Sequence, residues 1–242
     1  MSRHIHIPAK IEWATFLANS GEIDNYLVSP NELLRVRYAP APRRLALAMT
    51  DSCNLLWDFV TSTSSPDLHG LARTINETLI DGGVQEGIVY DPNLIPAPRL
   101  TREPTHLDKK TDFLYSDIDS TLQSWVSRFT ALDDQGSDFL DRKCIPVPFQ
   151  KDAAMFAWLS QYQWAHWCPF TGLNGMTGRY LTNAIRLRWS MPLWLCDIKK
   201  DSWWANLDMY SKIWLKKGSF FPIEEKSLPN LEKLNLVSQH SP

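Results

Sequence analysis

Residues 168–179 have the sequence Cys-Pro-Phe-Thr-Gly-Leu-Asn-Gly-Met-Thr-Gly-Arg and lie between two segments with the pattern of helices. The first predicted helix, from Lys151 to Ala165, is rich in Ala, Met, Phe and Trp. The second runs from about Asn174 to Trp189, and Pro192 prevents its continuation. The glycines of the connecting segment permit a tight turn with exposed backbone N–H groups at the start of a helix. Such a turn attracts phosphate or another anion.

The turn therefore supplies a candidate anion-binding site. Arg179 lies one helical turn inside the second helix, where its guanidinium can hold the same anion through two hydrogen bonds. The alternative is a structural ion pair of Arg179, for which Asp81 is the expected partner. The candidate anion-binding residues are Asn174, Gly175, Thr177, Gly178 and Arg179.

The rest of the sequence predicts a mainly helical protein. A capping box at Ser29 opens a short helix, with Pro30 at its first position and Glu32 at its third. Apolar residues at helical spacing indicate longer helices over about 43–60, 67–81, 116–132 and 201–217. We expect the second of these longer helices to end at Asp81-Gly82-Gly83, because glycine commonly terminates a helix.

A proline-rich stretch at 82–114 interrupts the helical pattern, because its prolines preclude a continuous helix. Within it, Ile88-Val89-Tyr90 and the segment before Phe113 predict a short β-hairpin. The stretch is long for a simple connection, which favours a functional flap or a docking surface. The expected organisation is an N-terminal helical region at 1–64, a core at 65–220 and a flexible tail at 221–242.

The composition excludes several classes of protein. The chain has 242 residues, 44% of them hydrophobic, and a net charge of −2. Wholesale disorder is therefore excluded, and attachment to nucleic acid through bulk positive charge is not expected. No apolar stretch is long enough for a membrane-spanning helix, and the N-terminus lacks the apolar core of a secretory signal. We expect a cytoplasmic protein without a membrane partner, with delivery into a host cell left open.

The four cysteines are far apart and form no Cys-x-x-Cys pair, so no zinc site or disulfide framework is expected. Cys168 lies near a helix N-terminus, which stabilises a thiolate, and is a candidate catalytic nucleophile. His166, two residues earlier, is a candidate base or partner of that thiol. The structural alternatives are a small buried thiol and a polar residue at a helix end.

The segment 168–179 resembles the core motif of the Fic family, His-Pro-Phe-x-Asp/Glu-Gly-Asn-Gly-Arg-x-x-Arg. Upstream, Glu77–Gly82 resembles the family's inhibitory segment, Ser/Thr-x-x-x-Glu-Gly/Asn, with Asp81 in place of its glutamate. The resemblance covers about residues 65–215 and implies a Fic-like helical bundle with a β-hairpin flap. The positions that coincide with the core motif, without a gap, are Pro169, Phe170, Asn174, Gly175 and Arg179.

The resemblance implies a transferase. Fic proteins commonly move AMP from ATP to a hydroxyl group on a target protein. The motif His acts as the base, the acidic residue holds Mg²⁺, and the glycines, the Asn and the two Arg bind the phosphates. These roles are positioning and charge neutralisation, as in other phosphoryl transfers. The implied cofactor is a nucleotide, and the implied partner is a protein or small molecule that carries a hydroxyl group.

The sequence departs from the motif at four positions. Cys168 replaces the catalytic His, and Gly172 replaces the acidic Mg²⁺ ligand. Leu173 takes the place of a Gly, and Met176 that of the first Arg. Loss of a general base alone lowers a rate by about 10²–10⁴-fold, and loss of the carboxylate removes the usual oxygen ligand of Mg²⁺. AMP transfer by the usual route is therefore not expected.

Three functions stay open on these residues. One is a divergent Fic-like transferase with an altered substrate or chemistry, which the retained residues of the turn favour. Another is a catalytically inactive binding or regulatory protein on the same scaffold, which the lost positions favour. The third is an enzyme that depends on Cys168 and acts on a small molecule. The donor, the acceptor and the oligomeric state are not predicted by the sequence.

Overall fold

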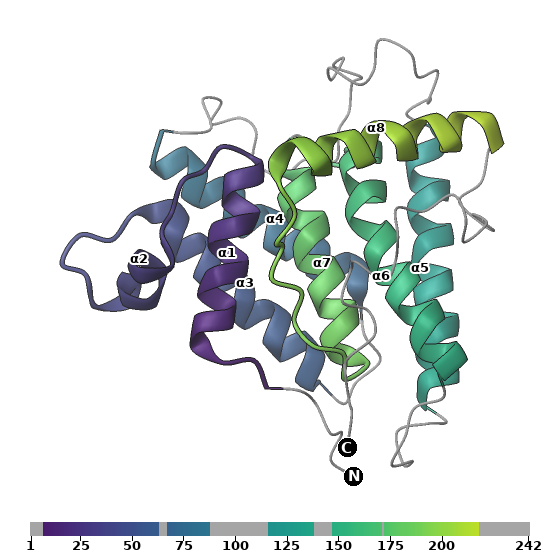
Figure 1. The fold of residues 1–242 in the computed structure, drawn as a ribbon, viewed down its shortest axis with the longest axis horizontal. Coiled ribbons are helices and arrows are strands. Elements are labelled where there is room, and N and C mark those ends of the chain that lie inside the picture. Colours follow the sequence, from purple (N-terminus) through teal and green to yellow (C-terminus); the bar gives the residue numbers. More distant parts are fainter. Residues whose placement is uncertain (1–6, 63–66, 88–115, 138–146, 171, 218–242) are drawn as a thin grey trace.

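The computed structural model describes residues 7–62, 67–87, 116–137, 147–170 and 172–217 (Figure 1). These residues form eight α-helices and one 3-10 helix, and no β-sheet occurs among them. The elements are α1 (Lys10–Ile23), α2 (Pro30–Arg35), the 3-10 helix Val36–Tyr38, α3 (Arg44–Thr61), α4 (Leu68–Gln85), α5 (Ser116–Ser137), α6 (Val147–Trp167), α7 (Asn174–Arg188) and α8 (Lys200–Lys217).

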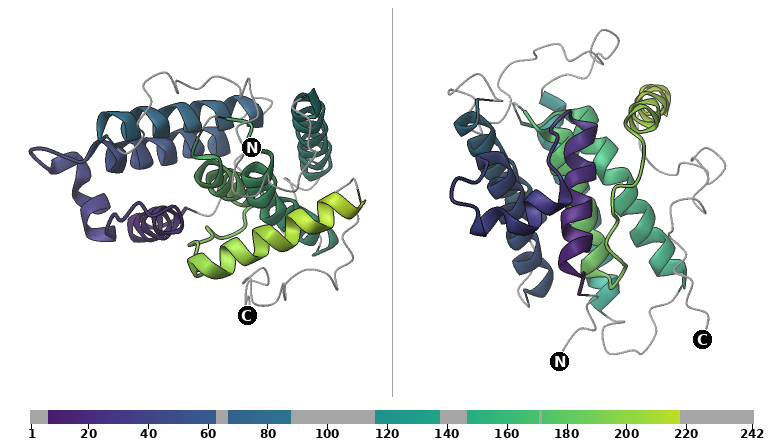
Figure 2. Two further views of the ribbon diagram at one scale, coloured as in Figure 1. Left: turned by 90° about the horizontal axis from the view of Figure 1, so that it is seen from above. Right: turned by 60° about the vertical axis from the view of Figure 1, so that its left-hand side comes forward.

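Helix α7 is the central element of this arrangement. It contacts α1, α3, α4 and α6, and every residue of it except Gly175 is buried. Helices α3 and α4 pack against each other on one side of α7, while α6 covers another side (Figures 1 and 2). Helix α8 lies crosswise to α7 in Figure 1 and contacts α6 and α1. The candidate site at the start of α7 is therefore enclosed by several helices.

The periodic apolar residues account for the packing, as the sequence predicts. The stripe of α3 is buried along its whole length, from Leu45 through Cys53 to Val60. On α5, Trp125 and Phe129 are buried as well. The apolar side chains from Ala14 to Tyr210 form one connected core. The mainly helical fold class is thus confirmed for the described residues, while the likeness to a Fic bundle stays a prediction.

Helix boundaries agree with the sequence at most ends. Ser29 caps α2 by accepting a hydrogen bond from the Glu32 backbone N–H at 3.1 Å. Helix α7 begins at Asn174 and ends at Arg188, one residue short of the prediction. Helix α1 is an element that the periodicity alone did not single out within the predicted N-terminal helical region. The predicted hairpin flap and the predicted tail at 221–242 lie outside the described residues.

The predicted end of α4 at Asp81-Gly82-Gly83 is wrong, because the helix continues to Gln85. Gly82 serves helix packing instead of helix termination. A Cβ atom on Gly82 would lie 2.4 Å from the Ala48 Cβ of α3, closer than two carbon atoms can approach. The glycine therefore lets α3 and α4 pack at short range.

Candidate functional site

The turn at 168–173 is closed by hydrogen bonds within the motif. Asn174 accepts a hydrogen bond from the Phe170 N–H at 2.9 Å and donates one to the Phe170 carbonyl at 2.8 Å. Two residues of the turn have left-handed backbone, Cys168 with φ 46° and Leu173 with φ 54°. Residues other than glycine adopt this conformation at a cost of about 1–2 kcal/mol. The Asn174 side chain therefore stabilises a strained turn.

Helix α4 holds the other side of the turn. Asn76, which is fully buried, donates hydrogen bonds to the Gly172 carbonyl at 2.8 Å and to the Thr177 hydroxyl at 3.0 Å. The Thr177 hydroxyl in turn donates to the Leu173 carbonyl at 2.9 Å. The side chain of Thr177 is thus engaged with the protein itself, as is that of Asn174. Sequence reasoning did not identify Asn76 as part of the site.

Arg179 is completely buried and is held by the C-terminal end of α1. Its Nε atom donates to the Ser20 hydroxyl at 2.9 Å, and its Nη2 atom donates to the Ser20 carbonyl at 2.9 Å. Nη2 also forms an ion pair with Asp24 at 2.5 Å. The guanidinium carbon lies 5.1 Å from the centre of a Trp203 ring, in the position of a cation–π contact. The charge of Arg179 is therefore compensated inside the protein.

One nitrogen of Arg179 differs from the other two. Nη1 is buried and has no hydrogen-bond partner among the described residues. It lies beside Gly175, where an added Cβ would be 3.3 Å from Nη1, 3.4 Å from Trp203 and 3.6 Å from the Asp24 Oδ1 atom. A buried N–H group without a partner is costly, by about 1–3 kcal/mol. Nη1 is therefore the donor of Arg179 that no described residue uses.

The structure does not pair Arg179 with Asp81. Asp81 is exposed on α4 and accepts a hydrogen bond from Gln85 at 2.6 Å. Asp24 takes the expected role, and the sequence does contain a signal for it. Asp24 directly follows the last residue of α1, where a carboxylate is unfavourable beside the negative end of the helix dipole. An acidic residue in that place indicates a cationic partner elsewhere in the chain.

Gly178 and Met176, two more positions of the segment, serve packing in the interior. A Cβ atom on Gly178 would lie 2.9 Å from the Gln161 carbonyl oxygen, so this glycine brings α7 close to α6. Met176, at the position of the first motif Arg, is fully buried. A longer, charged side chain at 176 would have to enter the apolar core. The first phosphate clamp of the family motif thus has no counterpart here.

Cys168 and His166 lie at the end of α6. The Cys168 thiol is partly exposed and donates a hydrogen bond to the Ala165 carbonyl at 3.1 Å. The His166 ring is buried and meets the Tyr210 ring of α8 edge-on, with ring centres 6.4 Å apart. Both side chains are therefore engaged with neighbouring parts of the protein.

The residues present do not fit the Mg²⁺ site of the family. Gly172 has no side chain, and its carbonyl already accepts a hydrogen bond from Asn76. No group of three His, Cys, Asp or Glu side chains that could hold a metal ion occurs in the described part of the chain. In the same residues, no helix is long and apolar enough to cross a lipid bilayer.

The interior around Arg179 strongly disfavours other charges. Burial raises the pKa of Tyr180 well above its usual value, although the nearby Arg179 charge acts in the opposite direction. Burial likewise raises the pKa of Cys196 to about 12. On the last turn of α7, burial lowers the pKa of Arg186 to about 10. A guanidinium kept in such surroundings needs a counter-charge, and Asp24 supplies it for Arg179.

Comparison with known proteins identifies no relative of this chain. No protein-family model matches the chain, and no curated protein or solved structure matches it either.

Proposed function

We propose that the chain is a divergent Fic-like transferase whose anion-binding turn is held closed by α1. The observation that carries the proposal is the contact of Arg179 with Ser20 and Asp24. In the closed state, Asp24 pairs with the guanidinium that would otherwise hold the phosphate of a nucleotide. Release of Asp24 would leave the guanidinium and the N-terminus of α7 available to a phosphate-bearing ligand.

The spacing of the α1 residues supports this proposal. Ser20, Asp24 and Asn25 match the inhibitory pattern Ser/Thr-x-x-x-Glu-Gly/Asn, with Asp in place of Glu. This match is fuller than that of Glu77–Gly82, which has no hydroxyl residue at the first position. Ser20 and Asp24 also bond to Arg179, the motif arginine. Asp81, by contrast, accepts its hydrogen bond from Gln85.

The chemistry differs from ordinary AMP transfer under this proposal. Cys168 stands where the base would be, and Gly172 provides no carboxylate for Mg²⁺. The residues that remain can bind a phosphate and orient it, because Arg179 is a bidentate donor and α7 presents its N-terminus. A donor that reacts without Mg²⁺, or an acceptor that is already nucleophilic, fits this set of residues. The acceptor is a hydroxyl group on a protein or a small molecule.

The competing proposal is a binding or regulatory protein that keeps the scaffold without catalysis. The burial of Met176 and the internal bonds of Asn174 and Thr177 favour it, because they turn motif positions into structural ones. The two proposals differ in one consequence. Freeing Arg179 creates a nucleotide site in the transferase, but it merely destabilises the scaffold in a non-catalytic protein.

The substitution Asp24→Asn tests the difference, because it removes the negative charge and keeps the shape of the side chain. Glu22→Gln, at an exposed position of α1, is the matched control. Each variant and the wild type are heated with ATP, ADP and pyrophosphate, with and without Mg²⁺. A ligand present at about ten times its Kd adds roughly 1.4 kcal/mol of stability, which raises the melting midpoint by about 3–6 °C.

We expect this increase for Asp24→Asn and a smaller one for the wild type and the control. The increase should disappear in the double variant Asp24→Asn/Arg179→Met. If no phosphate compound raises the midpoint of Asp24→Asn, the transferase proposal is wrong and the non-catalytic protein is favoured. The melting midpoint of Asp24→Asn without ligand is the folding control. If it lies well above room temperature, the variant is folded, and a lack of binding is not caused by unfolding.

A further inference from the structure

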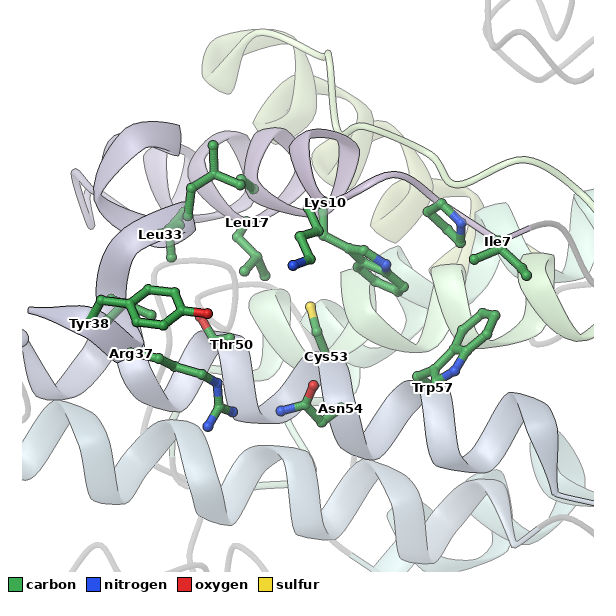
Figure 3. Close-up of a pocket in the computed structure, with 15 residues that line it drawn as sticks. Ile7, Lys10, Leu17, Leu33, Arg37, Tyr38, Thr50, Cys53, Asn54 and Trp57 are labelled. Carbon is green, nitrogen blue, oxygen red and sulfur yellow. The ribbon is translucent and has the colours of Figure 1, made fainter.

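A second candidate site lies along the N-terminal part of α1, whereas the Arg179 contact lies at its C-terminal end. A pocket of about 390 Å³ is formed between α1, the α2 region and α3. Its volume falls within the range of about 300–1,000 Å³ that is typical of small-molecule sites. In Figure 3 the lining side chains extend from Tyr38 and Leu33 at one end to Ile7 and Trp57 at the other. The pocket is therefore an elongated groove.

The walls of the groove are mostly apolar. Leu17, Leu33 and Val36 line it and are themselves buried, while Trp13 and Trp57 are only partly buried. At the rim, two more lining side chains are largely exposed, Ile7 at 76% and Tyr38 at 85%. Large apolar side chains left exposed around a concave surface are typical of a binding site. The aliphatic part of the groove matches a flexible hydrocarbon chain.

The charged side chains of the groove select the polar end of a ligand. Two of the lining residues are charged, Lys10 and Arg37, and both are cationic. Arg37 is already paired with Asp51 at 2.5 Å. No ion pair joins Lys10 to a described residue, and in Figure 3 its ammonium group points from α1 toward α3. Asn54, exposed on α3, lines the same pocket.

We propose that this groove binds a linear acyl carboxylate. The hydrocarbon chain lies against Leu17 and Leu33, and the carboxylate pairs with Lys10 and accepts a hydrogen bond from the Asn54 amide. The commitment to an anion follows from the Lys10 ammonium group, which forms no ion pair with a described residue, and from the absence of carboxylates among the described residues that line the groove. The commitment to an acyl chain follows from the aliphatic side chains and from the elongated shape.

Calorimetric titration of the full chain with decanoate, below its micelle concentration, tests the proposal. Decanol is the matched ligand, because it has the same chain without the charge. Lys10→Met removes the cation, and Lys151→Met, at an exposed position on α6, is the control. An exposed ion pair contributes about 0.2–1 kcal/mol, so Lys10→Met should weaken decanoate binding by up to about fivefold. It should leave decanol binding unchanged.

A second variant tests the location of the chain. Asn54→Trp places a large ring in the groove from an exposed position, where folding tolerates it, and should abolish the binding of both ligands. Light scattering of the wild type tests whether the groove is instead covered by another copy of the chain. The proposal is wrong if decanoate does not bind saturably, or if Lys10→Met and Lys151→Met have the same affinity for decanoate. It is also wrong if the wild type is a dimer that the rim substitution Tyr38→Asp dissociates.

Discussion

Replacing Asp24 by Ala should destabilise the protein by about 2–3 kcal/mol. Removing one partner of a fully buried ion pair costs about 3–5 kcal/mol, because the remaining charge has neither water nor a counter-charge. Arg179 meets this condition, since its side chain is 0% exposed, but the Asp24 side chain is 17% exposed. Water can therefore reach part of the vacated space, so the expected cost of about 2–3 kcal/mol lies at or below the lower end of this range.

The partner substitution gives the complete test. Arg179→Met removes the charge, the hydrogen bonds to Ser20 and the contact with Trp203, at a cost of about 2–4 kcal/mol. With the guanidinium gone, Asp24 has no charge to compensate. Asp24→Ala should therefore cost less than about 0.5 kcal/mol in the Arg179→Met background. The expected coupling free energy between the two residues is about 2 kcal/mol, in the range measured for residues in direct contact.

Urea unfolding, followed by the tryptophan fluorescence and by circular dichroism, measures the four free energies of the cycle. Coincident transitions in the two signals would show that unfolding is two-state. For a chain of this size, 2–3 kcal/mol corresponds to a lower melting midpoint by roughly 4–12 °C. If Asp24→Ala costs the same in both backgrounds, Arg179 and Asp24 are not coupled. The account of α1 as the element that holds the motif arginine would then fail.

Two further predictions follow from packing and from ionisation. Gly178→Ala should lower the unfolding free energy by about 1–3 kcal/mol, because the added methyl group meets the Gln161 backbone at 2.9 Å. Gly172→Ala is the control: no atom lies within 4 Å of the added methyl group, so the unfolding free energy should change by less than about 0.5 kcal/mol. Stability should also fall as the pH rises from 9 toward 12, because the Cys196 thiol keeps its proton in the folded state to about pH 12 and loses it near its ordinary value of 9.0 when unfolded. The contribution of this thiol to stability is fully present below pH 9. Burial also raises the pKa of the Cys53 thiol, so the double variant Cys196→Ala/Cys53→Ala should have a melting midpoint that depends less on alkaline pH. An unchanged dependence would contradict this.

The sequence by itself predicted much of the local structure. Capping residues and helical periodicity depend on neighbours three or four positions apart, so Ser29, the stripe of α3 and the start of α7 at Asn174 could be predicted from it. The resemblance of residues 168–179 to a known motif was visible in the same way, because a motif is a local pattern. The motif thus identifies the turn without any information on tertiary contacts.

The tertiary structure decided which partners these residues have. Arg179 and Asp24 are 155 positions apart, and only the packing of α1 against α7 brings the two charges together. The prediction for the end of α4 failed for a related reason, because Gly82 serves the close approach of α3 and does not end the helix. Burial removes water from these contacts, so a charge must find its counter-charge wherever the fold has placed it.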